Sequence, residues 1–368
     1  MNAPETIRDE NSTARSPEHF AARFSRMLND AAVVIMVSIG HRLELFDLMS
    51  RLPPASSDVI AEQAQLSERY VREWLAVMVT GGIVDYDPGH RHYTLDPAHA
   101  ACLTRAASPD NMAVTAQFIP LTGSMEDRLL DCFRSGEGLP YTAFPRCHEV
   151  MAEDSQQTVV AALESRILPL IPGLQQQLQQ GIEVLDAGCG GGLALLELAR
   201  TYPCSRFTGY DLCADAFAET AALAASQGVD NLTFEARDLR DFSESSRYGL
   251  ITTFDAVHDQ PDPAALLRGI AGALRPDGVY LMQDIAGSSV LENNLGHPLG
   301  PLLYSISCCH CTPVSLGQGG PGLGTLWGEE LALSMLEEAG FVDIRREYLP
   351  HDPFNVYFIA RRPDPRPQ

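Results

Sequence analysis

The sequence predicts an α/β protein with a doubly wound sheet in its second half and a mostly helical winged-helix domain before it. In the second half, short apolar strands alternate with helical segments, which is typical of a parallel sheet. In the first half, a helix, a turn and a longer helix precede two short strands. These patterns set the expected division of the chain: disordered N-terminus 1–16, winged-helix domain 17–105, helical connector 106–180, α/β domain 181–362 and tail 363–368.

The most informative segment is a glycine-rich turn between a buried strand, 182–185, and a helix that begins at Leu193. The turn carries three alternate glycines, Gly188, Gly190 and Gly192. Ligands bind α/β sheets at the carboxyl ends of the strands, and glycine lets a ligand approach the backbone closely. Asp186 before the turn, and Leu193 where the dinucleotide fingerprint needs glycine, argue against a nicotinamide or flavin site.

Acidic residues also follow the next two strands. Asp211 ends the strand that begins at Arg206, where a carboxylate accepts hydrogen bonds from both ribose hydroxyls. Asp238 and Leu239 follow the third strand; the acid would accept from an adenine amine while the leucine packs on the ring. Three acids at successive strand ends indicate a cofactor that contains adenosine, and we predict S-adenosylmethionine.

This arrangement resembles the seven-stranded class I S-adenosylmethionine-dependent methyltransferases over roughly the second half of the chain. The resemblance implies that the three glycines pass under the methionine part of the cofactor, that Asp211 holds the ribose, and that Asp238 and Leu239 read the adenine. We count Leu212 and Phe254, which stand at strand ends, with the cofactor-binding residues. The alternative is an α/β domain whose acids only cap its helices.

The first half reads as a winged helix, with helices expected over 56–63 and 67–80 and strands over 83–86 and 92–95. DNA binding is the obvious competing function. The second helix, however, carries as many acids as arginines, so that it offers no net positive charge to a duplex. Its apolar residues are expected to form a packing surface: Trp74, Leu75, Val77 and Met78.

This half is similar to the dimerisation domain of plant-type small-molecule O-methyltransferases and of a related bacterial group, which implies a homodimer and no nucleic-acid partner. In the connector, residues 147–151, with Ser155 after them, are similar to a Phe-Asn-x-x-Met segment that lies against the cofactor in those enzymes, which makes Met151 and Ser155 candidates for the same contact. Cys147 and His148 replace the Phe and Asn of that segment. The alternative for Met151 is an ordinary buried methionine.

His258 is the candidate general base, because it follows the fourth strand at the edge that carries the glycine turn. The segment resembles the His-Asp-Trp motif of the O-methyltransferases, with Gln260 in place of the tryptophan. Asp284, at the end of the fifth strand, is expected to orient the imidazole. The alternative is that His258 and Asp259 cap the helix that starts near Asp262.

Between the fifth strand and the next helix, residues 286–327 form an insertion that we expect to build the acceptor pocket. His310 and Trp327 are its candidates for contact with the acceptor. Cys308 and Cys311 form the chain's only CxxC spacing. Because no second pair completes a tetrahedral site, the sequence does not predict a metal.

Composition narrows the function classes further. The net charge is −22, and all 26 basic residues are arginines, which excludes lysine-based phosphate loops and Schiff bases. No apolar run approaches the length of a membrane span, and the nine cysteines form no disulfide pattern, so we expect a cytoplasmic protein without membrane contact.

We therefore predict an S-adenosylmethionine-dependent methyltransferase that transfers a methyl group to a small-molecule acceptor, at oxygen, with a histidine base. Three alternatives stay open: an acceptor sulfur or nitrogen, a winged-helix regulator that senses the cofactor as a ligand, and another reaction assisted by the sulfonium charge.

Overall fold

The computed structural model describes residues 16–363, and the chain divides after Pro120 into two compact units. The division falls within the helical connector that the sequence predicts. None of the helices within residues 16–363 is long and apolar enough to cross a membrane.

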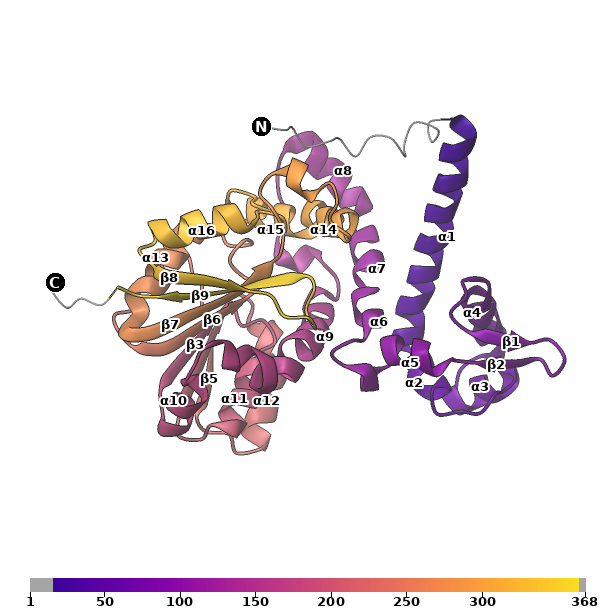
Figure 1. Ribbon diagram of the computed structural model, residues 1–368, viewed down its shortest axis with the longest axis horizontal. Coiled ribbons are helices and arrows are strands. Elements are labelled where there is room, and N and C mark those ends of the chain that lie inside the picture. Colours follow the sequence, from indigo (N-terminus) through magenta and orange to yellow (C-terminus); the bar gives the residue numbers. More distant parts are fainter. Residues whose placement is uncertain (1–15, 364–368) are drawn as a thin grey trace, which may run out of the picture. The chain divides into compact units, whose positions relative to one another are not determined.

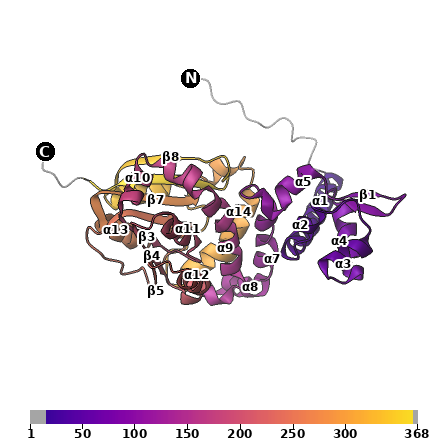
Figure 2. The same ribbon diagram turned by 90° about the horizontal axis from the view of Figure 1, so that it is seen from below.

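The first unit is helical apart from one antiparallel pair of strands (Figure 2). Its elements are α1 Pro17–Arg42, α2 Leu45–Met49, α3 Ser57–Ala64, α4 Glu68–Thr80, β1 Asp85–Asp87, β2 His92–Thr94, α5 Pro97–Leu103, η1 Arg105–Ala107 and α6 Met112–Thr115. The side chain of Ser56 caps α3, and Gln65 ends it in the left-handed region at φ 56°, which turns the chain into α4. The helix, turn, helix and hairpin follow the predicted order.

Helix α4 faces the core of this unit with its apolar side. Trp74, Leu75 and Met78 are buried, Val77 is partly buried against them, and the Trp74 ring N–H donates to the carbonyl of Met36. The expectation that the apolar residues of α4 are packing residues is confirmed.

The second unit is built on a seven-stranded sheet (Figure 1). Its strands are β3 Glu183–Ala187, β4 Arg206–Asp211, β5 Leu232–Ala236, β6 Tyr248–Phe254, β7 Leu274–Ile285, β8 Val342–Glu347 and β9 Asn355–Arg361. The strand order is β5-β4-β3-β6-β7-β9-β8, and β9 is antiparallel to both of its neighbours while the other pairs are parallel. The strands β3, β6 and β9 are apolar along most of their length, because both of their faces are covered and their side chains are buried on either side of the sheet.

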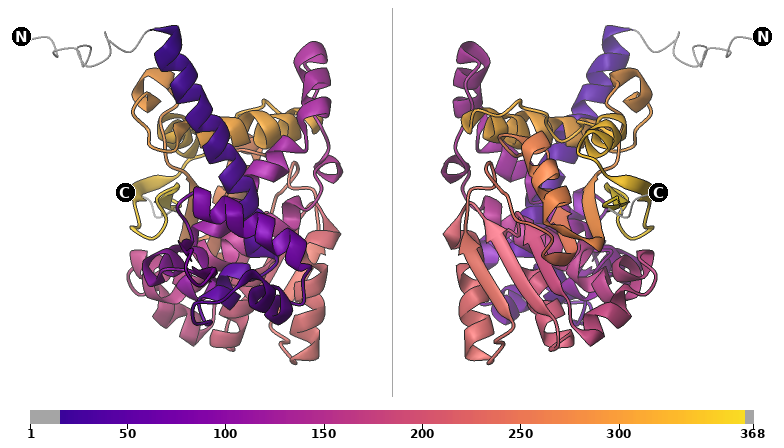
Figure 3. Two further views of the ribbon diagram at one scale, coloured as in Figure 1. Left: turned by 90° about the vertical axis from the view of Figure 1, so that its right-hand side faces the viewer. Right: turned by 90° about the vertical axis from the view of Figure 1, so that its left-hand side faces the viewer.

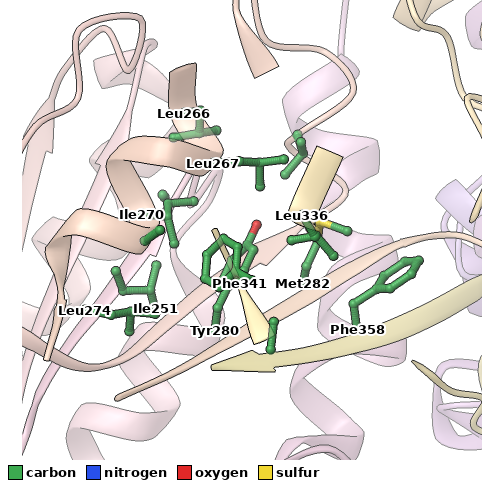
Figure 4. Close-up of a cluster of buried hydrophobic side chains, with 14 of the residues drawn as sticks. Ile251, Leu266, Leu267, Ile270, Leu274, Tyr280, Met282, Leu336, Phe341 and Phe358 are labelled. Atoms are coloured by element: carbon green, nitrogen blue, oxygen red, sulfur yellow. The ribbon is translucent and has the colours of Figure 1, made fainter. Parts of the chain in front are cut away.

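Helices cover both faces of this sheet (Figure 3). One core lies under α13 Pro263–Ala273 and α16 Glu329–Glu338, where Leu267, Ile270 and Leu336 meet Tyr280 and Phe358 of the sheet (Figure 4). The other lies under α10 Leu174–Gln180 and α11 Leu193–Thr201. Helix α12 Ala214–Ser226 packs beside β5. The two cores hold the strand ends of the central sheet at fixed positions, which is what a site at that edge requires.

Strand β7 is longer than the sequence predicts. We expect a turn at residues 275–278 and a strand over 280–283, whereas β7 begins already at Leu274. The pairing of β6 with β7 shifts register between Tyr248 and Leu250. This irregularity allows Pro276 and Gly278, which we expect in a turn, to lie within the strand.

The helical part that precedes the sheet comprises α7 Phe118–Gly123, which spans the division, α8 Glu126–Ser135, η2 Tyr141–Ala143, α9 Cys147–Thr158, η3 Val160–Ala162, η4 Leu163–Ile167 and η5 Leu168–Leu170. The insertion after β7 folds into η6 Leu291–Asn294, α14 Gly300–Ile306, η7 Ser307–Cys311 and α15 Thr312–Gly317.

The two segments touch backbone to backbone. Leu139 N donates to the carbonyl of Pro313 at 2.7 Å, and a Cβ on Gly138 would lie 2.0 Å from Gly317 N. Glycine at 138 and 317 thus allows the insertion to be anchored on the preceding helical segment.

Candidate active site

A cavity lies at the carboxyl ends of β3, β4 and β6, where the sequence predicts ligand binding. All eleven residues predicted to bind the cofactor line this one cavity: Met151, Ser155, Asp186, Gly188, Gly190, Gly192, Asp211, Leu212, Asp238, Leu239 and Phe254. They come from α9 and from four successive strand ends, so the parallel sheet gathers residues that lie up to 103 positions apart (151 to 254).

Asp211 ties the glycine turn to the end of β4. Gly190 N donates to one carboxylate oxygen at 2.8 Å, and Cys213 N donates to the other at 2.9 Å. Burial raises the pKa of Asp211, while these two N–H groups act in the opposite direction. Each oxygen keeps a lone pair for a ligand hydroxyl. A Cβ on Gly190 would meet no atom within 4 Å, so the turn leaves open space beside the carboxylate.

Asp186 is buried at the end of β3 and accepts a hydrogen bond from the Thr252 hydroxyl at 2.9 Å. Burial raises the pKa of Asp186 to about 7, against the effect of that hydrogen bond. A buried carboxyl with a pKa near neutrality binds a cationic ligand group favourably once it is ionised. Asp186 is therefore suited to face the positive charge of a ligand.

Leu239 is buried in the cavity wall, and Asp238 beside it is exposed. One oxygen of Asp238 accepts from Arg240 N at 2.9 Å, and within residues 16–363 no donor occupies the second, which leaves it open to a ligand amine. Leu239 thus offers an apolar contact for the adenine ring, and Asp238 offers an acceptor for its amine, as predicted from the sequence.

The catalytic candidates His258 and Asp284 lie behind a neighbouring stretch of the cavity wall. His258 Nδ1 is 2.8 Å from Asp284 Oδ1, so the expected contact between this histidine and this acid is present. Trp327 donates its ring N–H to the same oxygen at 2.9 Å, and Ile285 N donates to it at 2.8 Å. The register of β6 and β7 pairs Phe254 with Gln283, which brings the residues after each strand together.

His258 and Asp284 are buried behind the cavity wall, with 3% and 0% of their surface exposed, and neither lines the cavity. Trp327 is also buried, and its indole N–H is bonded to Asp284. Because Trp327 does not line the cavity, the wall does not offer the contact between Trp327 and the acceptor that the sequence predicts. Asp259 and His310 do line the cavity. His310 is the one predicted catalytic residue in direct contact with the space.

Helix capping does not explain the histidine. Asp262 alone caps α13 by accepting from Ala265 N at 2.8 Å. His258 and Asp259 make no capping bond to α13 and face Asp284 and the insertion instead.

The two imidazoles have opposite electrostatic environments. Burial by itself would lower the pKa of His258, but the carboxylates of Asp284 and Asp259 outweigh it and hold that pKa well above its usual range. Burial lowers the pKa of His310. His310 Nε2 lies 3.0 Å from the thiol of Cys147, and Phe144 packs edge-on against its ring.

The sequence analysis does not predict several residues that line the cavity. Tyr141 donates to Asp259 at 3.2 Å, and Arg237 and Gln318 also face the cavity. Tyr141 stands in the short helix η2 and Gln318 directly follows α15, both without a motif, so only the tertiary fold could reveal them.

Two family profiles match the chain. The profile of the Rv2258c-like winged HTH domain covers residues 31–105, and that of a methyltransferase domain covers residues 178–340. The chain carries a methyltransferase domain that follows a winged HTH domain. The cavity lies in the methyltransferase domain and offers acids, glycines and a leucine to the cofactor, S-adenosylmethionine.

Curated relatives match less than a third of the chain. The ubiquinone biosynthesis O-methyltransferase of Neisseria meningitidis serogroup C is 33% identical over 109 residues, which are 29% of this chain and 45% of that protein. The malonyl-[acyl-carrier protein] O-methyltransferase of Porphyromonas gingivalis is 30% identical over 109 residues, 30% of this chain and 40% of that protein. The match thus spans less than half the length of these relatives, within a domain of the O-methyltransferase type.

Solved structures match across both units. Human N-acetylserotonin methyltransferase in complex with S-adenosylmethionine superposes with a TM-score of 0.66 at 18% identity, covering 99% of this chain and 100% of that one. An O-methyltransferase family protein from Burkholderia thailandensis gives a TM-score of 0.67 at 14% identity, with 96% and 100% covered. At these identities the likeness concerns the fold.

Proposed function

We propose that this protein transfers the methyl group of S-adenosylmethionine to an oxygen atom of a small molecule, and that His258 activates the acceptor. The observation that carries the proposal is the pair His258–Asp284, joined at 2.8 Å directly behind a cavity whose wall holds the cofactor-type residues. Relatives named O-methyltransferases support oxygen as the acceptor atom.

For the cofactor, the glycine turn would run along the methionine part, Asp211 would accept from the ribose hydroxyls, and Asp238 with Leu239 would receive the adenine. When bound, the cofactor supplies a methyl group made electrophilic by a sulfonium. The chain's own task is then to exclude water, align the acceptor and remove its proton.

For the acceptor, Asp284 fixes the His258 ring through Nδ1 and leaves Nε2 directed toward Asp259, at 3.5 Å, on the cavity wall. We propose His258 as the base that takes the acceptor proton, and because Asp284 and Asp259 hold its pKa well above the usual range, the ring must first lose its own proton. His310, which the insertion brings into the cavity, would contact the acceptor, together with Tyr141. Both side chains belong to segments outside the sheet, so residues there can change the acceptor specificity without disturbing the strands.

The test is transfer of a labelled methyl group from S-adenosylmethionine to extracts of small metabolites, with the protein purified from its host. Label in a product of low molecular mass, stable as an ether or ester, supports the proposal. Label in protein or nucleic acid, or in none of the fractions, contradicts it. Regulation by DNA binding has little support, because Arg69 pairs with Glu73 on α4 and Arg72 pairs with Glu68.

The affinity for S-adenosylmethionine should rise with pH. Burial raises the pKa of Asp186 to about 7, and the cationic cofactor favours the ionised carboxylate, so that binding releases a proton. Raising the pH from about 6 to about 8 should therefore lower the Kd for S-adenosylmethionine by up to about tenfold. Calorimetric titration across this range measures it. Asp186→Asn should bind more weakly with a flat profile; a flat profile in the unchanged protein would contradict the role of Asp186.

We further propose that the protein is a homodimer that works in the cytoplasm. All nine cysteines are free thiols, as a reducing compartment allows. On α1, the residues Phe20, Phe24 and Leu28 are spaced by four and are 63%, 49% and 58% exposed, an apolar stripe that a second copy would cover.

The mass in solution, from light scattering, should be that of two chains at micromolar concentration. Phe24→Asp should shift it to one chain, whereas Phe133→Asp should not, although Phe133 on α8 is 76% exposed. A single-chain mass for the unchanged protein would refute the dimer.

A further inference from the structure

One acid of the cavity wall is used neither by the cofactor nor by the base. Asp255 directly follows β6 and lines the cavity. Within residues 16–363, its Oδ1 atom is buried and has no hydrogen-bond partner. The other acids of the wall already have a contact or an assigned role: Asp259 accepts from the hydroxyl of Tyr141 at 3.2 Å, and Asp186, Asp211 and Asp238 are the cofactor candidates. Because a buried carboxyl oxygen without a partner is costly, Asp255 indicates a ligand group that carries a donor.

The backbone of Asp255 is held in an uncommon conformation. Its φ is 50°, in the left-handed region that few residues other than glycine adopt. Asp255 N donates to the carbonyl of Gln283 at 3.1 Å, which ties this residue to β7. Such conformations cost energy and are frequent at ligand sites, where the surrounding structure fixes them. The chain thus fixes the carboxyl of Asp255 at the cavity wall.

Asp255 lies with the groups that we assign to the acceptor. It stands three residues before His258 in the chain. Burial raises the pKa of Asp255 well above its ordinary value, the charge of Asp284 adds to this effect, and His258 acts in the opposite direction. The carboxyl therefore ionises readily only when a positive group comes to it.

The lining of the cavity favours a cation over an anion. The sequence contains no lysine, and the one arginine in the described lining, Arg237, is bonded to Glu244 at 2.9 Å and lies over the Tyr210 ring. Burial lowers the pKa of His310, so this ring adds no positive charge at neutral pH. An acceptor carboxylate or phosphate would meet five lining acids and this paired arginine, whereas an ammonium group is attracted.

We propose that the acceptor is a small hydroxylated amine, whose ammonium group binds Asp255 while its hydroxyl faces His258. The inference rests on the proposed function and adds the chemical class of the acceptor. The ammonium donates to the buried Oδ1 atom of Asp255, and the proton that the carboxyl holds before binding passes to solvent. Asp255 is thus a binding residue that selects acceptors by charge, and it takes no part in the transfer of the methyl group.

The cofactor also carries an ammonium group, on its methionine part. The glycine turn is the candidate for that part, and Asp186 stands just before the turn. The acid whose charge acts on Asp186 is Asp211, whereas the charges of Asp284 and His258 act on Asp255. We therefore assign Asp186 to the cofactor and Asp255 to the acceptor, and the affinity for the cofactor separates the two roles.

The test uses the full chain and labelled S-adenosylmethionine. A small-molecule extract of the host is separated by ion exchange at pH 7 into cationic, neutral and anionic fractions, and each fraction is offered as the acceptor. Label should enter the cationic fraction, in a product that a cation exchanger still retains. Label confined to the neutral or anionic fractions overturns this inference and leaves the proposed function standing.

Asp255→Asn should raise the amount of the cationic fraction needed for the half-maximal rate about tenfold or more, because an amide cannot pair with an ammonium group. The Kd for S-adenosylmethionine should change little. Asp343→Asn is the matched control, because Asp343 also has a left-handed backbone, at φ 53°, but is exposed and lies outside the lining. Circular dichroism checks that both variants are folded. Equal effects of the two variants overturn the inference. A raised cofactor Kd with unchanged dependence on the acceptor also does so, because Asp255 would then serve the ammonium group of the cofactor.

Binding without turnover separates this inference from the proposed function. The protein, loaded with S-adenosylhomocysteine, is dialysed to equilibrium against the same extract, and the retained metabolites are identified by mass spectrometry. Cationic metabolites should be enriched, and Asp255→Asn should abolish the enrichment. Enrichment that depends on Asp255, with no label in any small molecule, overturns the proposed function and leaves the cation site standing. The absence of both enrichment and label overturns both.

Discussion

His258→Gln should lower kcat for methyl transfer roughly a hundredfold or more while the Kd for S-adenosylmethionine changes little. Gln keeps a polar side chain of similar length, but it can neither accept the acceptor proton nor place an imidazole nitrogen opposite Asp259. The cofactor is spared because His258 lies outside the cavity lining. Steady-state kinetics and calorimetry of the same preparation measure the two effects.

Asp284→Asn serves as the graded comparison. It keeps an acceptor for the ring N–H groups of Trp327 and His258 but removes the charge, so its loss should be smaller than that of His258→Gln. His90→Gln is the control, because His90 is an exposed histidine of the β1–β2 turn. A kcat within threefold of the unchanged protein for His258→Gln would remove this residue from the chemistry.

The sheet edge could be predicted from the sequence for a physical reason. Residues at the carboxyl ends of parallel strands meet whatever the helices between them are, so that Asp186, Asp211 and Asp238 could be placed together from strand patterns alone. The contact of His258 with Asp284 follows from the same rule, since β6 and β7 are neighbours in register.

The rest of the site depends on contacts that carry no local signal. Tyr141 meets Asp259, 118 residues away, and Cys147 meets His310, 163 residues away. These contacts join helical segments that approach each other closely, backbone to backbone, at Gly138 and Gly317. No hydrophobic periodicity in the sequence indicates such an approach. For the same reason the sequence presented Cys311 as half of a CxxC pair, whereas the fold sets it beside a histidine and an acid.

Asp211→Asn should raise the Kd for S-adenosylmethionine about a hundredfold, with a smaller effect on kcat at saturating cofactor. Both carboxylate oxygens accept backbone N–H groups, from Gly190 and Cys213, and an amide can serve only one of them. The variant would therefore loosen the glycine turn and also weaken the hydrogen bonds offered to the ribose. Hydrogen bonds to charged groups contribute about 1.5–3 kcal/mol each, and about 1.4 kcal/mol corresponds to tenfold in affinity.

Calorimetric titration measures this Kd. Asp215→Asn removes the same charge four residues further on, from an exposed position in the first turn of α12 outside the cavity lining, and should leave the Kd within about threefold. Equal losses in the two variants would mean that Asp211 acts only through the overall negative potential of an acidic protein. A large loss confined to Asp211→Asn would instead place the effect in the hydrogen bonds of Asp211 itself, to the glycine turn and to the ribose, because position 215 makes neither.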